Sequence, residues 1–405
     1  MADRTPLGTF PKRKYDILIK LQEDPLAPAL KIADAVNKLH PGESKKLSPT
    51  TVINTLSWLK ENNAFTEVHS VFKHEALDLK LIDVLIQPTS FEAIKLLETA
   101  KKDEKGEFWH FPHPYISYHA RINGAYDGLF CQFRIPANSI LLFNEYMKAL
   151  IEREIISKYE VLEREPGISA YTKADLNAWE PDEYRWNFKG KQWISGYNSK
   201  KYPFKRVEPP ESILQRLDEI DILLLAELSR DARRKNKEIG ITVKKALQGR
   251  SSNKNIPFEL ASQDLSRRLK TLKKEAIDRF RLFLNWKIFD IYNTAFFTCK
   301  ARRSVTESVA GYLKSGTINF PFESVFSGLK DGFYWYMRAP SNAISQVIEL
   351  LWQETDSRAM SLIDYRSSKV YDLWSEVYNT ETKYWRDDYQ FMVEEPLKII
   401  DSQKF

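Results

Sequence analysis

The sequence predicts an α+β protein of two tandem units, each a winged helix-turn-helix followed by a ferredoxin-like βαββαβ domain. Three observations lead to this prediction. Two stretches about 204 residues apart share one string of residue types, each unit opens with amphipathic helical segments, and each then alternates strand-like and helix-like runs. The 405 residues also exceed what one hydrophobic core usually serves. We therefore expect several domains related by duplication.

The repeat is clearest around a turn and the strand that follows it. Residues 127–140 read Asp-Gly, an apolar-aromatic run and then Arg-x-Pro-x-Asn-x-Ile, and residues 331–344 read the same way. A second match lies upstream, where residues 14–21 correspond to residues 219–226, 205 positions later. Two matches at nearly one spacing predict that a whole unit was duplicated.

Each unit begins with helices. In the first unit, residues 16–21 and 29–39 have helical spacing of apolar residues, and Ser48 and Pro49 open a third helix. Ser48 is a favoured cap, and Pro49 suits the first helical position because the N–H there has no helical partner. In the second unit the third helix is expected over residues 262–275. The expected buried stripes are Val52, Leu56 and Leu59 in the first unit and Leu265, Leu269 and Leu272 in the second.

Alternating and β-branched runs follow each set of helices. The expected strands are residues 79–86, 116–122 and 128–135 in the first unit, and 283–292, 295–299 and 332–337 in the second. The expected helices between them are residues 91–100, 139–153, 305–313 and 343–354. This order is ferredoxin-like. The predicted divisions are a winged helix at 1–66, a ferredoxin-like domain at 67–164, an aromatic connector at 165–211, a second winged helix at 212–280, a second ferredoxin-like domain at 281–366 and a tail at 367–405.

Composition bounds the class of protein. No apolar run approaches twenty residues, and no apolar signal-peptide core lies near the N-terminus, so we expect a cytoplasmic protein with no membrane partner. The two cysteines, Cys131 and Cys299, lie in apolar aromatic runs typical of buried strands, which speaks against disulfides and zinc fingers. The histidines near residues 110–119 have no carboxylate or thiolate beside them in the sequence. No metal site and no cofactor are therefore expected.

Charge is concentrated locally. Residues 230–274 carry 14 Lys and Arg against 4 Asp and Glu, whereas residues 1–204 carry 28 against 27. A recognition helix needs short polar or basic side chains opposite its apolar stripe. The candidate DNA contacts are Lys45, Lys46, Thr50, Thr51, Asn54, Thr55 and Lys60 in the first unit, and Ser262, Gln263, Ser266, Arg267, Arg268, Lys270 and Lys273 in the second. Because one helix is polar and the other basic, the halves are not expected to read identical half-sites.

Residues 16–21, 47–59 and Gly124-Ala125-Tyr126-Asp127 resemble the leucine-responsive regulator family (Lrp/AsnC, feast/famine), here in a tandem duplicated form. The resemblance implies that the ferredoxin-like (RAM-like) domains mediate dimer formation and sense amino acids, and that the chain is a fused dimer. The ligand residues that it implies are Gly124, Tyr126, Asp127 and, in the second unit, Asp331. The second unit departs from the family pattern, because it reads Gly-Leu-Lys-Asp at residues 328–331 and has an insertion near residues 248–257.

These observations predict a sequence-specific, double-stranded DNA-binding transcriptional regulator that is not an enzyme, with an amino acid as its candidate effector. Two alternatives stay open. Tyr118-His119-Ala120-Arg121 before residues 124–127 resembles siroheme decarboxylases, enzymes of the same fold that act on a tetrapyrrole, and loss of such activity in His119→Ala would support that reading. A winged-helix scaffold for protein interactions is the other alternative. Duplex binding that weakens steeply with salt would support the regulator.

Overall fold

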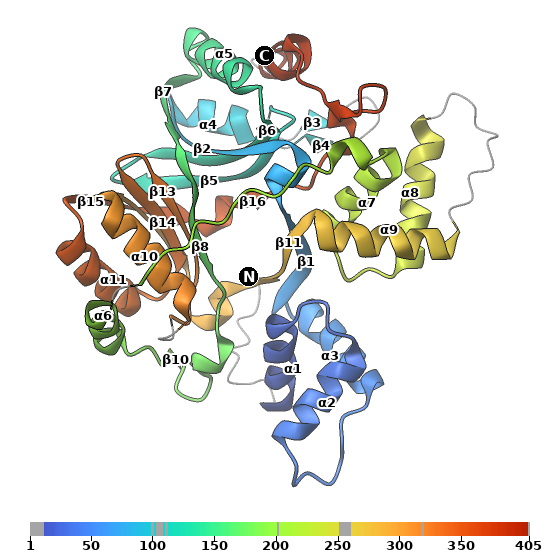
Figure 1. Cartoon of the computed structure of the whole chain (residues 1–405), viewed down its shortest axis with the longest axis vertical. Coiled ribbons are helices and arrows are strands. Elements are labelled where there is room, and N and C mark those ends of the chain that lie inside the picture. Colours follow the sequence, from blue (N-terminus) through green and yellow to red (C-terminus); the bar gives the residue numbers. More distant parts are fainter. Residues whose placement is uncertain are drawn as a thin grey trace.

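The computed structural model describes residues 12–98, 101–102, 108–109, 112–200, 202–250, 261–316 and 320–403. Within them the chain is α+β, and two similar halves share one central sheet (Figure 1). The predicted fold class is confirmed. The insertion expected near residues 248–257 lies mostly outside the described residues.

The first half runs from helices into a βαββαβ sequence of elements. Its helical part is α1 (Lys12–Glu23), α2 (Ala29–Leu39) and α3 (Pro49–Glu61), followed by β1 (Phe65–Phe72) and the short helix η2 (His74–Leu77). Its sheet part is β2 (Leu79–Pro88), α4 (Phe91–Glu98), β5 (Ile116–Gly124), β6 (Gly128–Pro136), α5 (Ile140–Glu152) and β7 (Ile156–Leu162), with a small β3 (Lys101–Lys102) and β4 (Phe108–Trp109) hairpin. Ser48 caps α3 as expected, since its side chain accepts a hydrogen bond of 3.1 Å from the Thr51 N–H.

The second half repeats this order. Its helical part is α7 (Glu219–Arg230), α8 (Asn236–Arg250) and α9 (Ser262–Glu275), followed by β11 (Ile277–Leu284) and η5 (Trp286–Phe289). Its sheet part is β12 (Asn293–Lys300), α10 (Arg303–Ser315), β13 (Glu323–Leu329), β14 (Gly332–Arg338), α11 (Ser341–Glu354) and β15 (Ser357–Asp364). Leu265, Leu269 and Leu272 are the buried residues of α9, as expected.

The strand expected at residues 283–292 is wrong beyond Leu284. The chain turns there into η5, and Asp290 has a left-handed backbone with φ of 57°. The same turn occurs in the first half after η2, where Asp78 has φ of 52°. Asn285 starts the turn by accepting a hydrogen bond of 3.3 Å from the Lys287 N–H. The apolar run around Trp286 resembles a strand in sequence because periodicity cannot separate it from a short buried helix.

The two half-sheets form one continuous strand order, β7-β2-β6-β5-β15-β12-β14-β13-β8, where β8 is Arg164–Thr172 and β16 (Lys369–Val370) also pairs with β5. The halves join where Ile122 of β5 pairs with Ile363 of β15, and where Tyr171 of β8 pairs with Val325 of β13. Only Glu163 separates β7 from β8, so the order begins and ends in one stretch of chain. The sheet thereby closes on itself, and an inner cluster that includes Phe130, Phe296 and Tyr334 fills the space that it encloses.

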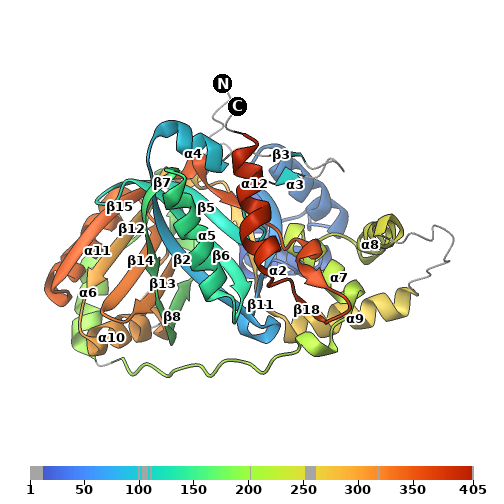
Figure 2. The ribbon, with the colours of Figure 1, turned by 90° about the horizontal axis from the view of Figure 1, so that it is seen from above.

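The duplication extends into the connector and the tail, which the sequence had left without counterparts. The connector contains η3 (Leu176–Ala178), β9 (Trp179–Glu180), β10 (Arg185–Trp186) and α6 (Gly190–Ser199). The tail contains η7 (Ser375–Val377), β17 (Tyr378–Asn379), β18 (Tyr384–Trp385), η8 (Gln390–Glu394) and α12 (Glu395–Asp401). Each segment packs on the opposite half, α6 on α11 and α12 on α5 (Figure 2). Correspondingly, Trp186 Nε1 donates to the Phe289 carbonyl at 2.8 Å, and Trp385 Nε1 donates to the Leu77 carbonyl at 2.5 Å.

Strands β1 and β11 pair with each other as an antiparallel ribbon, and the two helical trios lie on either side of it (Figure 1). The residues at the centre of the ribbon are His69 and Arg281, which pair directly and occupy equivalent positions in the two halves. No helix in the described part of the chain combines the length and the apolar character needed to cross a bilayer.

Candidate functional site

The third helix of the first half presents part of the expected polar face. Thr50, Thr51 and Asn54 are exposed on α3, and Lys45 and Lys46 are exposed in the loop before it. The expectation for Thr55 is wrong, because its side chain is buried on the same side of the helix as Val52 and Leu59. Lys60 is exposed and lies 3.7 Å from Glu67 and 3.9 Å from Asp231.

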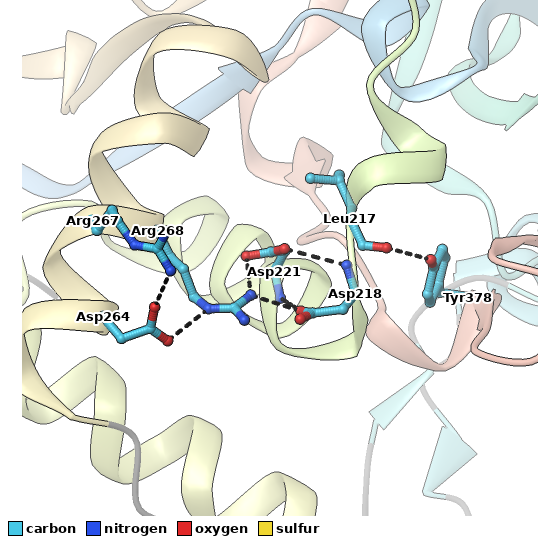
Figure 3. Close-up of polar contacts among 7 residues, drawn as sticks. All are labelled: Leu217, Asp218, Asp221, Asp264, Arg267, Arg268 and Tyr378. Carbon is cyan, nitrogen blue, oxygen red and sulfur yellow. Dashed lines mark hydrogen bonds and ion pairs between the residues drawn. The ribbon is translucent and has the colours of Figure 1, made fainter.

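The basic helix of the second half is tied to its own domain. Arg268 forms ion pairs with Asp218 at 2.9 Å, Asp221 at 2.8 Å and Asp264 at 3.0 Å, and these carboxylates belong to the start of α7 and to α9 (Figure 3). Arg267 also contacts Asp264, at 2.6 Å. Burial disfavours the Arg268 charge, but the hydrogen bonds that Arg268 donates to Asp221 and Asp264 outweigh burial and raise the pKa of Arg268. This arginine therefore fixes α9 against α7.

The remaining candidates on α9 differ in exposure. Ser262, Gln263, Ser266 and Lys270 are exposed, and Ser266 Oγ lies 3.4 Å from Asn236 Nδ2. Lys273 is half-buried, and burial lowers its pKa.

The residues expected to bind a ligand lie in two separate hairpin turns. Gly124, Tyr126 and Asp127 share the β5–β6 turn, where Asp127 Oδ1 accepts a hydrogen bond of 2.9 Å from the Gly124 N–H. The Tyr126 N–H donates to Ser361 Oγ at 3.0 Å. Asp331 lies in the β13–β14 turn, and its carbonyl accepts a hydrogen bond of 3.2 Å from the Ala301 N–H. Both aspartates are exposed, and each accepts a hydrogen bond from a backbone N–H group.

Polar side chains collect instead between the facing half-sheets. We call this set the inner polar layer; its members are buried or half-buried on the inner sheet faces or against them. They are Asp83, Tyr118, Gln132, Arg134, Arg164, Arg281, Glu323, Tyr334, Tyr336 and Arg338. Burial of so many polar groups is costly unless they are paired, so their partners decide what the layer can do.

Asp83 centres the first network. It is fully buried on β2 and accepts hydrogen bonds from Gln132 Nε2 at 2.7 Å, Arg164 Nη2 at 2.9 Å and the Tyr334 hydroxyl at 2.7 Å. Burial disfavours the Arg164 charge, but Asp83 outweighs it and raises the pKa of that guanidinium. Because Tyr334 belongs to the second half, this network also links the two half-sheets.

Glu323 centres the second network. It is 2% exposed at the start of β13 and accepts a hydrogen bond of 3.0 Å from Arg281 Nε. Arg338 also forms an ion pair with it, and the Tyr171 hydroxyl lies 3.4 Å from Oε2. Burial would raise the pKa of Glu323, but Arg281 and Arg338 outweigh burial and lower it. The carboxylate is therefore charged and shared by two arginines.

Arg134 has no such partner. Its guanidinium is half-buried and lies over the Phe72 ring at 5.6 Å, and among the described residues it forms no ion pair. Burial lowers the pKa of Arg134 to about 10, and the charge of Asp372 opposes this change. The layer thus holds four arginines against the two carboxylates Asp83 and Glu323. An excess of buried positive charge is what an anionic ligand can neutralise.

Residues 118–121 point alternately to the two faces of β5. Tyr118 faces the inner layer, and its hydroxyl lies 3.0 Å from Ser368 Oγ. Burial raises the pKa of Tyr118 to about 12, although Arg338 and Arg281 oppose the rise. His119 and Arg121 face the outside of the sheet, where His119 Nδ1 lies 2.7 Å from the Tyr371 hydroxyl. His119 therefore lies on the opposite face of β5 from the inner polar layer.

Glu98 of α4 completes that outer cluster. Its carboxylate lies 3.8 Å from His119 Nε2 and accepts a hydrogen bond of 3.0 Å from Arg121 Nε. Within the described ranges, no three His, Cys, Asp or Glu side chains gather as ligands for a metal ion.

No family model matches this sequence, and no curated protein matches it. Two solved structures are similar to it, the crystal structure of the siroheme decarboxylase NirDL and that of the same enzyme in co-complex with an iron-uroporphyrin III analogue. Their TM-scores are 0.47 and 0.46, each at 11% sequence identity. They cover 97% and 96% of this chain and 100% of those chains.

The prediction of a DNA-binding regulator that is not an enzyme is wrong, as is that of double-stranded DNA and an amino-acid effector as its partners. The solved structures that match over nearly the whole chain are those of an enzyme, one of them with a tetrapyrrole analogue. Within the chain, Arg268, which the prediction assigned to DNA contact, is held by Asp218, Asp221 and Asp264. What remains of the resemblance to Lrp/AsnC regulators is the fold.

One sequence feature, the repeated arginine of the Arg-x-Pro-x-Asn motif, indicates the inner polar layer. Arg134 and Arg338 occupy the same position in the repeated Arg-x-Pro-x-Asn motif, and each lies on the inner face of its strand. The sequence pattern of this motif predicted only the duplication. Since a strand alternates its faces, its phase relative to Phe130 would have placed Arg134 on the inner side.

Proposed function

We propose that this chain is an enzyme that acts on a carboxylate-bearing tetrapyrrole and binds a carboxylate of that substrate with Arg134 of the inner polar layer. The observation that carries the proposal is the charge imbalance of this layer, in which Arg134 forms no ion pair among the described residues. Arginine pairs with carboxylates through parallel hydrogen bonds, which makes it the preferred residue for such groups.

Aromatic rings of the inner cluster lie close to the inner polar layer. Phe130 lies 4.9 Å from Phe296 and 6.3 Å from Tyr334, measured between ring centroids, and the Arg164 guanidinium lies over the Tyr334 ring at 5.7 Å. These rings are at most 2% exposed and pack against one another, so the flat apolar ring of a macrocycle would lie beside the cluster, with its peripheral carboxylates directed toward the guanidinium groups. A tetrapyrrole such as uroporphyrin combines both properties in one molecule.

Tyr118 is the residue best suited to supply a proton in a decarboxylation. The bond between the carboxylate carbon and its neighbour breaks, carbon dioxide leaves, and the electron pair left on the neighbour takes a proton. The Tyr118 hydroxyl faces the inner layer and is protonated at neutral pH, so it can give that proton. The charge of Arg281 would stabilise the phenolate until water protonates it again.

Titration with iron-uroporphyrin III, followed by visible absorbance, tests binding, and anaerobic incubation with detection of carbon dioxide tests turnover. We expect Arg134→Gln to weaken binding by about tenfold or more, because the ligand carboxylate loses its charged partner. Tyr118→Phe should keep the affinity and lower the rate by about 10²-fold or more. A wild-type protein that does not bind the macrocycle would overturn the proposal.

A further inference from the structure

The two halves of the inner polar layer are not equivalent as binding sites. We infer that the chain has one open carboxylate site, at Arg134, and that the corresponding site at Arg338 is filled by the chain's own Glu323. The inference rests on the proposed function only for the identity of the ligand, since the asymmetry itself is a property of the described side chains.

Arg134 and Arg338 are counterparts in sequence and in space. They stand 204 residues apart in the same motif, at the ends of β6 and β14. Each guanidinium lies over an aromatic ring of its own half, Arg134 over Phe72 at 5.6 Å and Arg338 over Trp286 at 5.9 Å. The duplication therefore created two similar candidate anion sites, one at Arg134 and one at Arg338.

Glu323 occupies the second place as a bound carboxylate would. It pairs across the strands with Arg338, receives two hydrogen bonds from Arg281, and has the Tyr171 hydroxyl at 3.4 Å. The Glu323 side chain is buried, and its charge is neutralised by Arg338 of the sheet and by Arg281 of the β1–β11 ribbon. The donors on this side are thus already used by a carboxylate of the protein.

Within the described part of the chain, the site at Arg134 has neither an internal carboxylate nor a second arginine. The residue opposite Arg134 is Tyr115, whose carbonyl accepts a hydrogen bond of 2.8 Å from the Arg134 backbone N–H and whose hydroxyl donates to the Arg386 carbonyl at 2.7 Å. The counterpart of Arg281 is His69, whose pKa is lowered by burial. Asp372 acts on the charge of Arg134 but forms its own ion pair with Arg230, at 3.4 Å. Among the described residues, no carboxylate fills this site.

The asymmetry gives the ligand one site and one orientation. A ligand that presents a carboxylate to Arg134 meets a charged partner without an intrachain competitor, whereas at Arg338 it would have to displace Glu323. Because buried ion pairs are costly to break, the second exchange is disfavoured. We therefore expect one ligand molecule per chain.

Malonate is a suitable probe because it tests the carboxylate sites without requiring a macrocycle. Calorimetric titration of the wild-type chain should give one site, with affinity falling about tenfold or more in Arg134→Gln. Glu323→Gln removes the internal carboxylate and should gain a second site. The double variant Glu323→Gln/Arg338→Gln should return to one site, which places the gained site at Arg338.

If Glu323→Gln does not fold, the malonate affinity of the single variant Arg338→Gln still tests the inference. This variant should bind malonate within about twofold of the wild type, since Glu323 retains Arg281 and the open site is untouched. Equal losses in Arg134→Gln and Arg338→Gln, or a folded Glu323→Gln variant without a second site, would overturn the inference. If malonate behaves as expected but uroporphyrin does not bind, the proposed substrate fails and the single open site stands.

Discussion

His113 is a fully buried titratable group in an apolar setting. Its ring lies among Phe133 at 5.3 Å, Phe143 at 5.8 Å and Tyr146 at 4.8 Å, measured between ring centroids. Its Nδ1 accepts a hydrogen bond of 3.3 Å from the Tyr115 N–H, so the neutral ring fits the site. Burial lowers the pKa of His113 to about 3 from the ordinary value of 6.5.

This burial makes stability depend on pH. Between pH 6.5 and about 3 the unfolded chain binds a proton at His113 and the folded chain does not, so the free energy of unfolding falls as pH is lowered. From pH 7 to pH 5 the loss amounts to about 2 kcal/mol, because one pKa unit corresponds to about 1.4 kcal/mol. In urea denaturation series, His113→Phe should show a smaller loss than the wild type by that amount. Identical losses in the two proteins would contradict this assignment.

At the scale of elements, the repeated Asp-Gly pairs mark where two strands approach too closely for a side chain. Gly332 has φ of +148°, and a Cβ placed on it would lie 1.9 Å from the Cys299 carbonyl oxygen. Gly128 has φ of +151°, and its Cβ would lie 2.1 Å from the Ile86 carbonyl oxygen. The obstacle in both cases is backbone of a neighbouring strand, which cannot move aside alone.

We expect Gly332→Ala to destabilise the protein by at least about 2 kcal/mol, because the substitution adds both a clash and a strained backbone. Gly42 offers a matched control, since a Cβ on it would meet no atom within 4 Å. Gly42→Ala should change the free energy of unfolding by less than about 0.5 kcal/mol. Thermal unfolding followed by circular dichroism measures both, and equal effects would refute the packing argument.

The elements with local signals could be predicted from sequence. The Ser48 cap, the leucine stripe of α9 and the apolar strand β6 depend on residues within one or two turns of each other, so their patterns are visible in the chain. The sequence prediction missed strand β13 and assigned η5 to a strand, because the periodicity of a short apolar run cannot separate a strand from a helix. Their states are determined by the strands that they pair with or pack against.

The candidate site could be predicted only in part. Tyr118 was noted through its motif, and the repeat singled out Arg134 and Arg338 without a role. The significance of Arg338 depends on Glu323, which reaches it only when β13 pairs with β14, and the Asp83 network forms only when Tyr334 of the second half meets β2 of the first. The polar residues of α3 and α9 favoured these helices as functional faces, because charged residues are visible in a sequence. The ion pair between Arg268 and Asp221 is not visible there, because its partners are distant in the chain.

At the scale of the whole molecule, the halves exchange their C-terminal segments. The connector of the first half places Trp186 and α6 on the second half, and the tail of the second half places Trp385 and α12 on the first. The residues that the tail brings include Phe391, Met392 and Ile400, all fully buried. Each half thus completes the hydrophobic core of the other, in addition to the strand pairs β5–β15 and β8–β13.

This exchange predicts that the halves do not fold independently. A chain cut between Pro209 and Pro210, in the extended segment before α7, keeps every element described here in one fragment or the other. Each fragment alone would expose the apolar faces that the exchanged segments cover, as well as unpaired strand edges, so we expect separate fragments to aggregate or lack a cooperative unfolding transition. Coexpressed fragments should form a 1:1 complex with the circular dichroism spectrum of the intact chain. Size-exclusion chromatography distinguishes these outcomes, and two stable monomeric fragments would show that the exchange contributes little to the fold.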